Sequence, residues 1–318
     1  MAEPSPSLSV VIPVYNSATI LPALLDRLAP VLEGLGGTFE VILVDDRSRD
    51  ESWRVIEELA ADRPWLRGLR MMRNFGQHNA LLAGIRAARH ELIVTMDDDL
   101  QNPPEEIGRL LEALGTDNDV VYGYPETEQH GLFRDLASVV TKFALQSAMG
   151  SETARHSSAF RVFRTSLRDA FADFRGQFVS IDVLLTWGTT RFDAIQVRHD
   201  PRREGVSNYT LRKLITHALN MLTGFSVFPL QLASLTGFAL TLFGLAVLAF
   251  VVIRYLLQGS GTAPGFPFLA SIIAIFSGAQ LFALGIMGEY LARMHFRMMA
   301  RPTYAIAEHL GTEPAQPR

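Results

Sequence analysis

Three consecutive aspartates, Asp97, Asp98 and Asp99, follow a short apolar run and have the chemistry of a binding site. Adjacent carboxylates repel one another unless a positive charge neutralises them. The chain has no cysteine and its histidines lack metal-ligand spacing, so oxygen ligands remain, which favours Mg²⁺ or Mn²⁺. Alternation along a strand would place Asp97 and Asp99 on one face, and Gln101 follows two residues later. We therefore expect a metal site at Asp97, Asp99 and Gln101; the alternative is a solvated turn that caps the next helix.

Further polar groups also stand at the ends of apolar runs. Pro13, Tyr15 and Asn16 end the first run, and Asp45 and Asp46 end the second, where simple helix capping is the alternative. Strands are expected at 8–14, 39–44, 66–71, 91–96 and 119–123, and helices at 20–35, 52–61, 79–88 and 104–114. This alternation predicts an α/β domain with a mostly parallel sheet and helices on both faces. Ligands of such sheets bind at the carboxyl ends of the strands, which is where these groups fall.

The C-terminal part of the chain belongs to a different class of sequence. No Asp, Glu, Lys or Arg occurs at 214–253, and after Arg254 none occurs before Glu289. Apolar stretches near 230–257 and 266–291 each exceed the roughly 20 residues that cross a bilayer, and 258–265 has the composition of a turn. We expect a two-helix transmembrane hairpin at 230–292; two buried helices of a soluble core are the alternative.

Basic residues flank this hairpin on the side away from its turn. They are Arg212, Lys213, Arg293, Arg297 and Arg301, against Arg254 near the turn. The positive-inside rule then places the domain at 1–210 and the tail at 293–318 in the cytoplasm, in a multi-pass protein of the cytoplasmic membrane. Apolar residues recur at helical spacing in 211–229, which predicts an interfacial amphipathic segment on the bilayer, or else an ordinary packing helix.

Four segments together resemble the family 2 glycosyltransferases. They are Val-Ile-Pro-Val-Tyr-Asn at 11–16, Val-Asp-Asp-Arg-Ser-Arg-Asp at 44–50, Arg-Asn-Phe-Gly at 73–76 and Asp-Asp-Asp-Leu-Gln-Asn-Pro-Pro at 97–104. The resemblance is to the polyprenyl-phosphate branch, which includes dolichol-phosphate mannose synthases and bacterial undecaprenyl-phosphate sugar transferases, and it covers 7 to about 222. It implies a GT-A fold whose nucleotide-sugar site uses Pro13, Tyr15, Asn16, Asp45, Asp46 and Asp98. Asp97, Asp99 and Gln101 match the family's Asp-x-Asp-x-Gln motif for metal and diphosphate.

A basic segment at 199–209 resembles the family's Arg-x-x-Gly-x-Ser-Lys-Tyr loop. Arg202 and Ser207 match, and Arg203 is adjacent. The resemblance implies that these residues, with Arg161, bind the acceptor phosphate and the departing diphosphate; contact with anionic headgroups is the alternative. The chain departs from the family at Asn208, where Lys is frequent, and at Ala159, where some relatives have an acidic residue. A phosphate monoester acceptor is already ionised, so no base is required there.

The expected activity is an inverting transfer from a nucleotide sugar to polyprenyl (undecaprenyl) phosphate, for cell-envelope glycan assembly. Asp97, Asp99 and Arg202 would be the catalytic residues, with Mg²⁺ or Mn²⁺ as cofactor and the lipid bilayer as a partner; self-association is left open. Two alternatives are a glycosyltransferase that extends a saccharide hydroxyl at the membrane and a non-catalytic scaffold on the same fold. A net charge of −4 makes a nucleic-acid partner unexpected.

Overall fold

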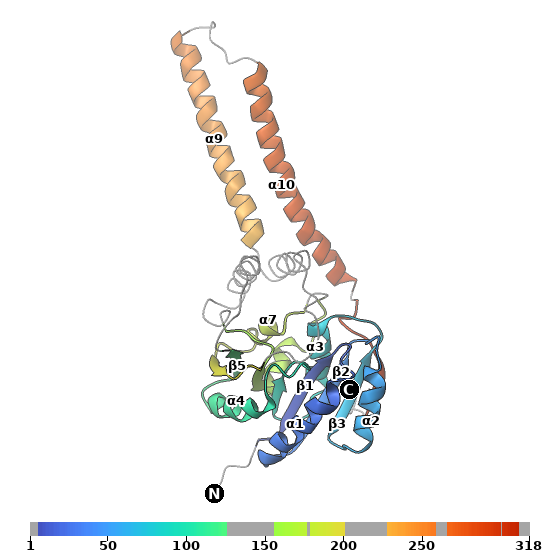
Figure 1. The fold of residues 1–318 in the computed structure, drawn as a ribbon. Helices are drawn as coiled ribbons and strands as arrows, with labels where there is room; N and C mark the ends of the chain where they lie inside the picture. Colours follow the sequence, from blue (N-terminus) through green and yellow to red (C-terminus); the bar gives the residue numbers. More distant parts are fainter. Residues whose placement is uncertain are drawn as a thin grey trace.

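The computed structural model describes residues 6–125, 156–176, 179–200, 228–258, 266–299 and 301–311. These residues form an α/β domain from which two long helices project on one side (Figure 1). The predicted interfacial segment at 211–229 falls almost wholly outside the described residues. Arg202, Arg203, Ser207 and Asn208 lie outside them as well.

An eight-stranded sheet forms the centre of the domain, in the order β7-β5-β6-β4-β1-β2-β3-β8. The strands are β1 (Leu8–Val14), β2 (Phe39–Asp45), β3 (Leu66–Met71), β4 (Leu92–Thr95), β5 (Val120–Pro125), β6 (Arg161–Arg164), β7 (Phe192–Val197) and β8 (Ile306–Leu310). The neighbours β4, β1, β2 and β3 are parallel, as predicted. The strands β6 and β8 run antiparallel to their neighbours, and the sequence patterns did not predict them.

Helices cover both faces of this sheet. On one face lie α1 (Leu21–Gly34), α2 (Ser52–Ala61), η1 (Pro104–Glu106) and α4 (Ile107–Leu114); on the other lie α3 (Gln77–Ala87), η2 (Thr165–Phe171) and α7 (Ile181–Leu185). Alternate residues of β1 enter the two layers, since Val10 and Ile12 pack with the first set and Val11 with the second. A strand apolar on both faces is typical of a parallel sheet buried between helices. The mostly parallel sheet and the helices on both of its faces were predicted.

The helix α3 packs very closely on the sheet. A Cβ atom added at Gly84 would meet Val11 Cγ1 at 2.3 Å, which real contacts do not allow, and Val44 Cγ2 at a tight 3.0 Å. Glycine at this position therefore lets α3 approach β1 and β2. This approach fixes the N-terminus of α3 beside the carboxyl ends of both strands.

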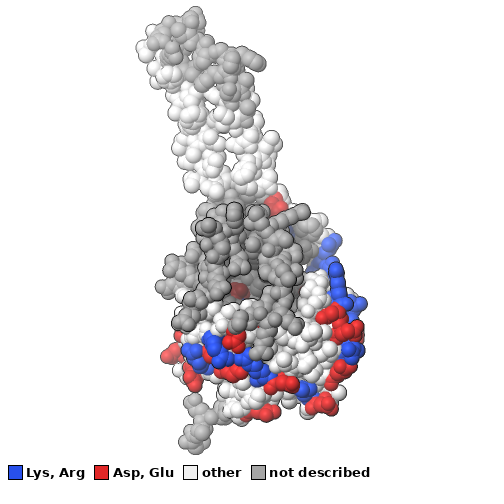
Figure 2. Space-filling view, viewed as in Figure 1, with Lys and Arg blue, Asp and Glu red and all other residues white. Residues whose placement is uncertain are grey.

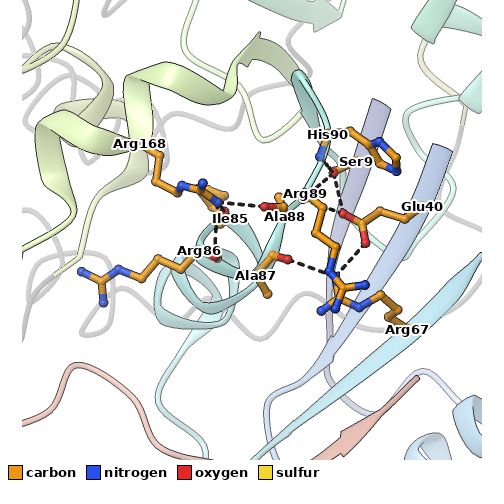
Figure 3. A network of polar contacts seen from close by, with 10 residues as sticks. All are labelled: Ser9, Glu40, Arg67, Ile85, Arg86, Ala87, Ala88, Arg89, His90 and Arg168. Atoms are coloured by element: carbon orange, nitrogen blue, oxygen red, sulfur yellow. Dashed lines mark hydrogen bonds and ion pairs between the residues drawn. The ribbon is translucent and has the colours of Figure 1, made fainter. Parts of the chain in front are cut away.

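A buried polar network holds the opposite, amino edge of the sheet together (Figure 3). Glu40 accepts hydrogen bonds from Ser9 Oγ, the Arg89 backbone N–H and Arg67 Nη1, each at 2.7 Å. Arg67 Nη1 also donates to the Ala87 carbonyl at 3.0 Å, and Arg168 Nη1 donates to the Ala88 carbonyl at 2.8 Å. Carbonyls at a helix C-terminus have no partner within the helix, so these two arginines satisfy the end of α3.

The two long helices are α9 (Phe228–Gln258) and α10 (Phe266–Met298). The windows Pro229–Phe250 and Ile275–His295 are long and apolar enough to cross a membrane, and almost none of their residues are buried. Figure 2 shows an essentially uncharged surface along both helices, whereas the charged side chains gather on the domain. Helices of a soluble core would be buried, so the exposure of these two favours the transmembrane prediction over that alternative.

The segment after α10 returns to the domain. The predicted tail at 293–318 is thus partly wrong, because α10 continues to Met298 and Ile306–Leu310 form the edge strand β8. Ile306 pairs with Met71, and the Met72 N–H donates to the Ala305 carbonyl at 2.9 Å. A short strand of mixed polarity that pairs only with a distant partner has little local signal, which explains why the sequence analysis missed it.

Candidate active site

The loops that follow β1 and β2 are joined by hydrogen bonds at the carboxyl edge of the sheet. The Asn16 N–H donates to Ser48 Oγ at 3.0 Å, and the Arg49 N–H donates to Asn16 Oδ1 at 2.8 Å. The Ser17 N–H donates to Ser52 Oγ at 2.9 Å. Asn16 has φ 55°, a left-handed conformation that asparagine tolerates better than most residues. Its side chain therefore fixes the second loop while its backbone turns the first.

The aspartate triplet lies at the same edge, but in a turn. The strand β4 ends at Thr95, and Leu100 is buried with φ 58°. The prediction that strand alternation places Asp97 and Asp99 on one face is therefore wrong, because the strand stops before both residues. The three carboxylates instead differ in their hydrogen-bond partners.

Asp97 and Asp99 are half-buried and differ in what holds them. Gln77 Nε2, at the start of α3, donates to Asp97 Oδ1 at 2.6 Å. The Gln101 N–H donates to Asp99 Oδ1 at 3.1 Å, which closes the turn locally. Two carboxylates and one amide oxygen are a sparse set of oxygen ligands. Mg²⁺ usually takes one or two protein carboxylates and completes its shell with water and substrate phosphates, so these residues fit such an ion.

The described part of the chain contains no complete set of protein ligands for a metal ion. Among its residues, no group of three or more His, Cys, Asp or Glu side chains is arranged to hold a metal ion. The metal site predicted at Asp97, Asp99 and Gln101 would thus be completed by the substrate. Its ligand set stays a prediction.

Asp98 points toward the β1 loop. Ser17 Oγ and the Tyr15 backbone N–H donate to its carboxylate. Burial, with the nearby charge of Asp99, raises the pKa of Asp98 to about 6, although the hydrogen bonds act in the opposite direction. In this position Asp98 joins the Asp97–Gln101 turn to the loop that carries Tyr15.

Asp45 and Asp46 are buried, with exposed fractions of 0 % and 3 %. The Phe75 and Gly76 N–H groups donate to the two carboxylate oxygens of Asp46 at 2.7 and 2.8 Å. The Ser48 N–H donates to Asp45 Oδ1 at 3.0 Å. Burial raises the pKa of Asp46. This geometry gives both residues a part in shaping the loops, and the predicted direct contact with a base or ribose stays untested.

The residues at the end of β1 that are predicted to bind the nucleotide sugar differ in exposure. Tyr15 is 40 % exposed and Asn16 is exposed, so both side chains are accessible at the edge of the site. Pro13 is a buried residue of β1 and pairs with Val44 of β2. Pro13 therefore supports the strand end, and the accessible surface comes from the two residues that follow.

Arg161 occupies a position that does not support the predicted phosphate-binding role. Its side chain is 1 % exposed, pairs with Asp182, and donates through Nε to Thr95 Oγ1 at 3.1 Å. Tyr122 Oη donates to the same aspartate at 3.1 Å, and burial raises the pKa of Tyr122. The resemblance around Ala159–Arg161 implied an acceptor site for Arg161. The burial of Arg161 could not be foreseen, because its partner Asp182 lies on another element and cannot be recognised from local sequence.

A further contact joins the start of the basic segment at 199–209 to the Asp97–Gln101 turn. The Asp200 N–H donates to the Gln101 carbonyl at 2.8 Å. Arg27 holds the Asp200 carboxylate at 3.2 Å and binds Glu105 through two nitrogens, and Arg198 pairs with Asp200 at 3.3 Å. Asp200 precedes the predicted Arg202 by two residues, so the chain enters the basic segment directly beside Gln101. The sequence analysis missed Arg27 and Gln77, because no motif marks a helix side chain that contacts a distant turn.

Comparisons with known proteins agree with this fold. The model of the family Glycosyl transferase family 2 matches residues 9–173. The undecaprenyl-phosphate 4-deoxy-4-formamido-L-arabinose transferase of Pseudomonas fluorescens (strain SBW25) is 35 % identical over 311 residues, covering 97 % of this chain and 91 % of the relative. The protein of the same name from Aeromonas hydrophila is 36 % identical over 312 residues, covering 97 % and 96 %.

Solved structures share the fold. Glucosyl-3-phosphoglycerate synthase from Mycobacterium tuberculosis, in complex with Mn²⁺, UDP-glucose and phosphoglyceric acid, superposes with a TM-score of 0.52 at 16 % identity, covering 69 % of this chain and 78 % of that one. This likeness shows the GT-A fold alone. Because the family model covers half of the chain and curated relatives match nearly all of it, the protein is a glycosyltransferase and belongs to glycosyl transferase family 2.

Proposed function

We propose that the protein transfers a sugar from a nucleotide-sugar donor to undecaprenyl phosphate, with inversion at the anomeric carbon. The relatives that match along almost their whole length, apolar hairpin region included, are named for this acceptor. Their name also makes 4-deoxy-4-formamido-L-arabinose the first sugar to test. The observation that carries the proposal is the position of the Asp97–Gln101 turn relative to the hairpin.

That position follows from the register of β8. Ile306 pairs with Met71 at the carboxyl end of β3, and only eight steps of chain separate it from Met298 at the end of α10. At a maximum of about 3.5 Å per residue, the carboxyl edge of the sheet lies within about 28 Å of the end of α10. The carboxylate turn after β4 is on the same edge. A phosphate carried at a bilayer surface is thus within reach of a domain held in this way.

The proposed chemistry is one displacement. A phosphate oxygen of the lipid bonds to the anomeric carbon, the bond from that carbon to the diphosphate breaks, and the nucleoside diphosphate leaves. A divalent ion held by Asp97 and Asp99 would neutralise charge on the diphosphate. Gln77 orients Asp97, and Asp98 holds the Tyr15 loop. Arg202, Arg203 and Ser207 are proposed to bind the phosphates, in a segment that starts beside Gln101.

Both helices are proposed to cross the cytoplasmic membrane, with the domain and both termini in the cytoplasm. The lengths and exposure of the helices support the crossing. The pairing of β8 with β3 supports a location of the segments before α9 and after α10 on the same side of the membrane, and the basic residues that flank the hairpin favour the cytoplasm as that side.

The test is transfer of labelled sugar into organic-extractable lipid. Purified protein, undecaprenyl phosphate, Mg²⁺ or Mn²⁺ and a panel of nucleotide sugars are combined, with Asp99→Asn as the test variant. The matched control is Asp62→Asn, at an exposed aspartate that follows α2. We expect label in the lipid phase, a loss of at least about 100-fold in Asp99→Asn, and wild-type transfer in the control.

Other outcomes decide against the proposal in distinct ways. Metal-dependent nucleotide binding without label in the lipid, for every donor, favours the alternative of a saccharide hydroxyl acceptor. No metal-dependent binding of a nucleotide diphosphate favours the non-catalytic scaffold. Normal transfer by Asp99→Asn contradicts the metal role of that residue.

A further inference from the structure

Arg70 of β3 lies between two carboxylates that come from opposite ends of the chain. Its Nη1 donates to Glu308 Oε1 of β8 at 2.8 Å, and its Nε is 3.6 Å from Asp45 Oδ2 at the end of β2. The guanidinium also lies 5.5 Å from the centre of the Trp53 ring, which restricts its position. One side chain thus contacts both the strand that follows α10 and a residue of the candidate site.

The contact with Asp45 matters because that carboxylate is fully buried. Asp45 Oδ1 accepts the Ser48 N–H, whereas Oδ2 is buried without a hydrogen bond. A buried carboxylate is costly unless an opposite charge is near, and Arg70 supplies one. Ser48 in turn accepts the Asn16 N–H through its hydroxyl. The position of Arg70 therefore bears on the loop 45–49 and, through it, on Asn16.

The contact with Glu308 ties the same arginine to the membrane hairpin. Arg70 and Glu308 are register partners in the β3–β8 pair, and the register shifts between Arg70 and Met71. The strand β8 is anchored nearby by the Met72 N–H bond to Ala305. Tyr304 and Ile306 add packing against the same layer as α3. A displacement of the segment after α10 would thus change the partner of Arg70.

We propose that Arg70 is a positioning residue that couples β8, and with it the membrane hairpin, to the donor-side loop 45–49. The expected effect of this coupling on donor binding rests on the proposed function. Its expected effect on the loop 45–49 does not. Docking of β8 places Glu308 on Arg70, the held guanidinium faces Asp45, and Asp45 keeps Ser48 and Asn16 in their binding arrangement. Loss of either charged partner of Arg70 should loosen this loop while leaving the acceptor side intact.

The test uses the full-length protein with Arg70→Gln, Arg70→Lys and Glu308→Gln. The matched control is Glu58→Gln, which removes the exposed partner of an ion pair on α2. The first readout is hydrogen–deuterium exchange of the amides at 46–49, which requires no substrate. The second is the KM for the nucleotide sugar beside the KM for undecaprenyl phosphate.

We expect faster exchange at 46–49 and a donor KM raised about tenfold in Arg70→Gln and about threefold in Glu308→Gln, with an unchanged acceptor KM. Arg70→Lys, which keeps the charge, should restore most of the donor affinity. Unchanged exchange in both Arg70→Gln and Glu308→Gln overturns the proposal, whether or not the protein transfers the sugar tested. If Arg70→Gln fails to fold, Glu308→Gln decides, because Glu308 is half-exposed and its loss leaves Arg70 in place.

Discussion

At the scale of single residues, three adjacent side chains of the same type have three different surroundings. Asp97 is held by α3, Asp98 by the β1 loop and Asp99 by its own turn. Identical carboxylates are thus distinguished by which donor reaches them. The metal prediction depends on two of these contacts, so the residues that make them should affect metal binding without touching the ion.

Gln77→Ala tests this at the contact of 2.6 Å with Asp97. Removal of a residue that orients a metal ligand typically costs 10- to 100-fold in affinity or activity, so we expect the concentration of Mn²⁺ needed for half-maximal transfer to rise about tenfold. Gln77 is exposed, so Tm should change little. Metal titration of activity is the measurement, with Gln196→Ala, on the exposed surface of β7, as control. An unchanged metal requirement would show that Gln77 does not orient Asp97.

Sequence reasoning located the triplet, Asp45, Asp46 and the loop with Tyr15 and Asn16 at one edge of the sheet, and the structure confirms that edge. It did not distinguish accessible from buried members of the set. Arg161 shows the reason: its motif is local, whereas its burial depends on Asp182 and Thr95. Partner residues that approach from other elements decide burial, and no spacing rule encodes them.

At the scale of elements, the network at Glu40 joins the starts of β1, β2 and β3 to the end of α3 (Figure 3). Burial alone would raise the pKa of Glu40, but the hydrogen bonds from Arg67, Ser9 and the Arg89 N–H outweigh burial and lower it. Because this pKa is lowered, ionised Glu40 stabilises the fold at a pH above 4.5, the ordinary pKa of a glutamate. This stabilisation is lost as the pH falls through the pKa of Glu40 in the folded protein.

Glu40→Gln should therefore lower Tm strongly at pH 7, since breaking a buried ion pair costs about 3–5 kcal/mol. The Tm difference from wild type should shrink as the pH falls below about 4.5, because protonated Glu40 then resembles glutamine. Thermal unfolding in detergent from pH 7 to 3 measures this, and Glu58→Gln, at an exposed pair, is the control. A constant Tm difference across that range would refute the assigned role of Glu40.

Local periodicity predicted the elements that are continuous in sequence and buried on two faces. The bounds of β1, β3 and α2 were predicted to the residue, and those of α1 and α3 within two residues. The strands β6, β7 and β8 were missed. Their partners are β4, β5 and β3, which lie far away in sequence, and a short strand of mixed polarity is defined by such a partner rather than by its own pattern.

At the scale of the whole molecule, the orientation of the hairpin can be tested by cysteine labelling. The sequence has no cysteine, so an introduced cysteine is labelled specifically. A single cysteine can be introduced as Ser260→Cys, between the two helices, or as Glu58→Cys, on the domain. In intact cells of a bacterial host, a membrane-impermeant maleimide should label Ser260→Cys and leave Glu58→Cys unlabelled until the membrane is opened. Labelling of both from outside, or the reverse pattern, would contradict the proposed orientation.

The return of the chain to β3 after α10 also orders the events of biosynthesis. The domain at the N-terminus is synthesised first, but its sheet remains one strand short until residues 306–310 have followed both apolar helices out of the ribosome. Until then the edge of β3 is unpaired, and Arg70 has no Glu308 to contact. The sheet can therefore be completed only after the hairpin has been synthesised and has brought the C-terminal segment back to the side of the domain. A chain whose second helix failed to cross would be left with an open sheet edge, the kind of surface on which aggregation begins.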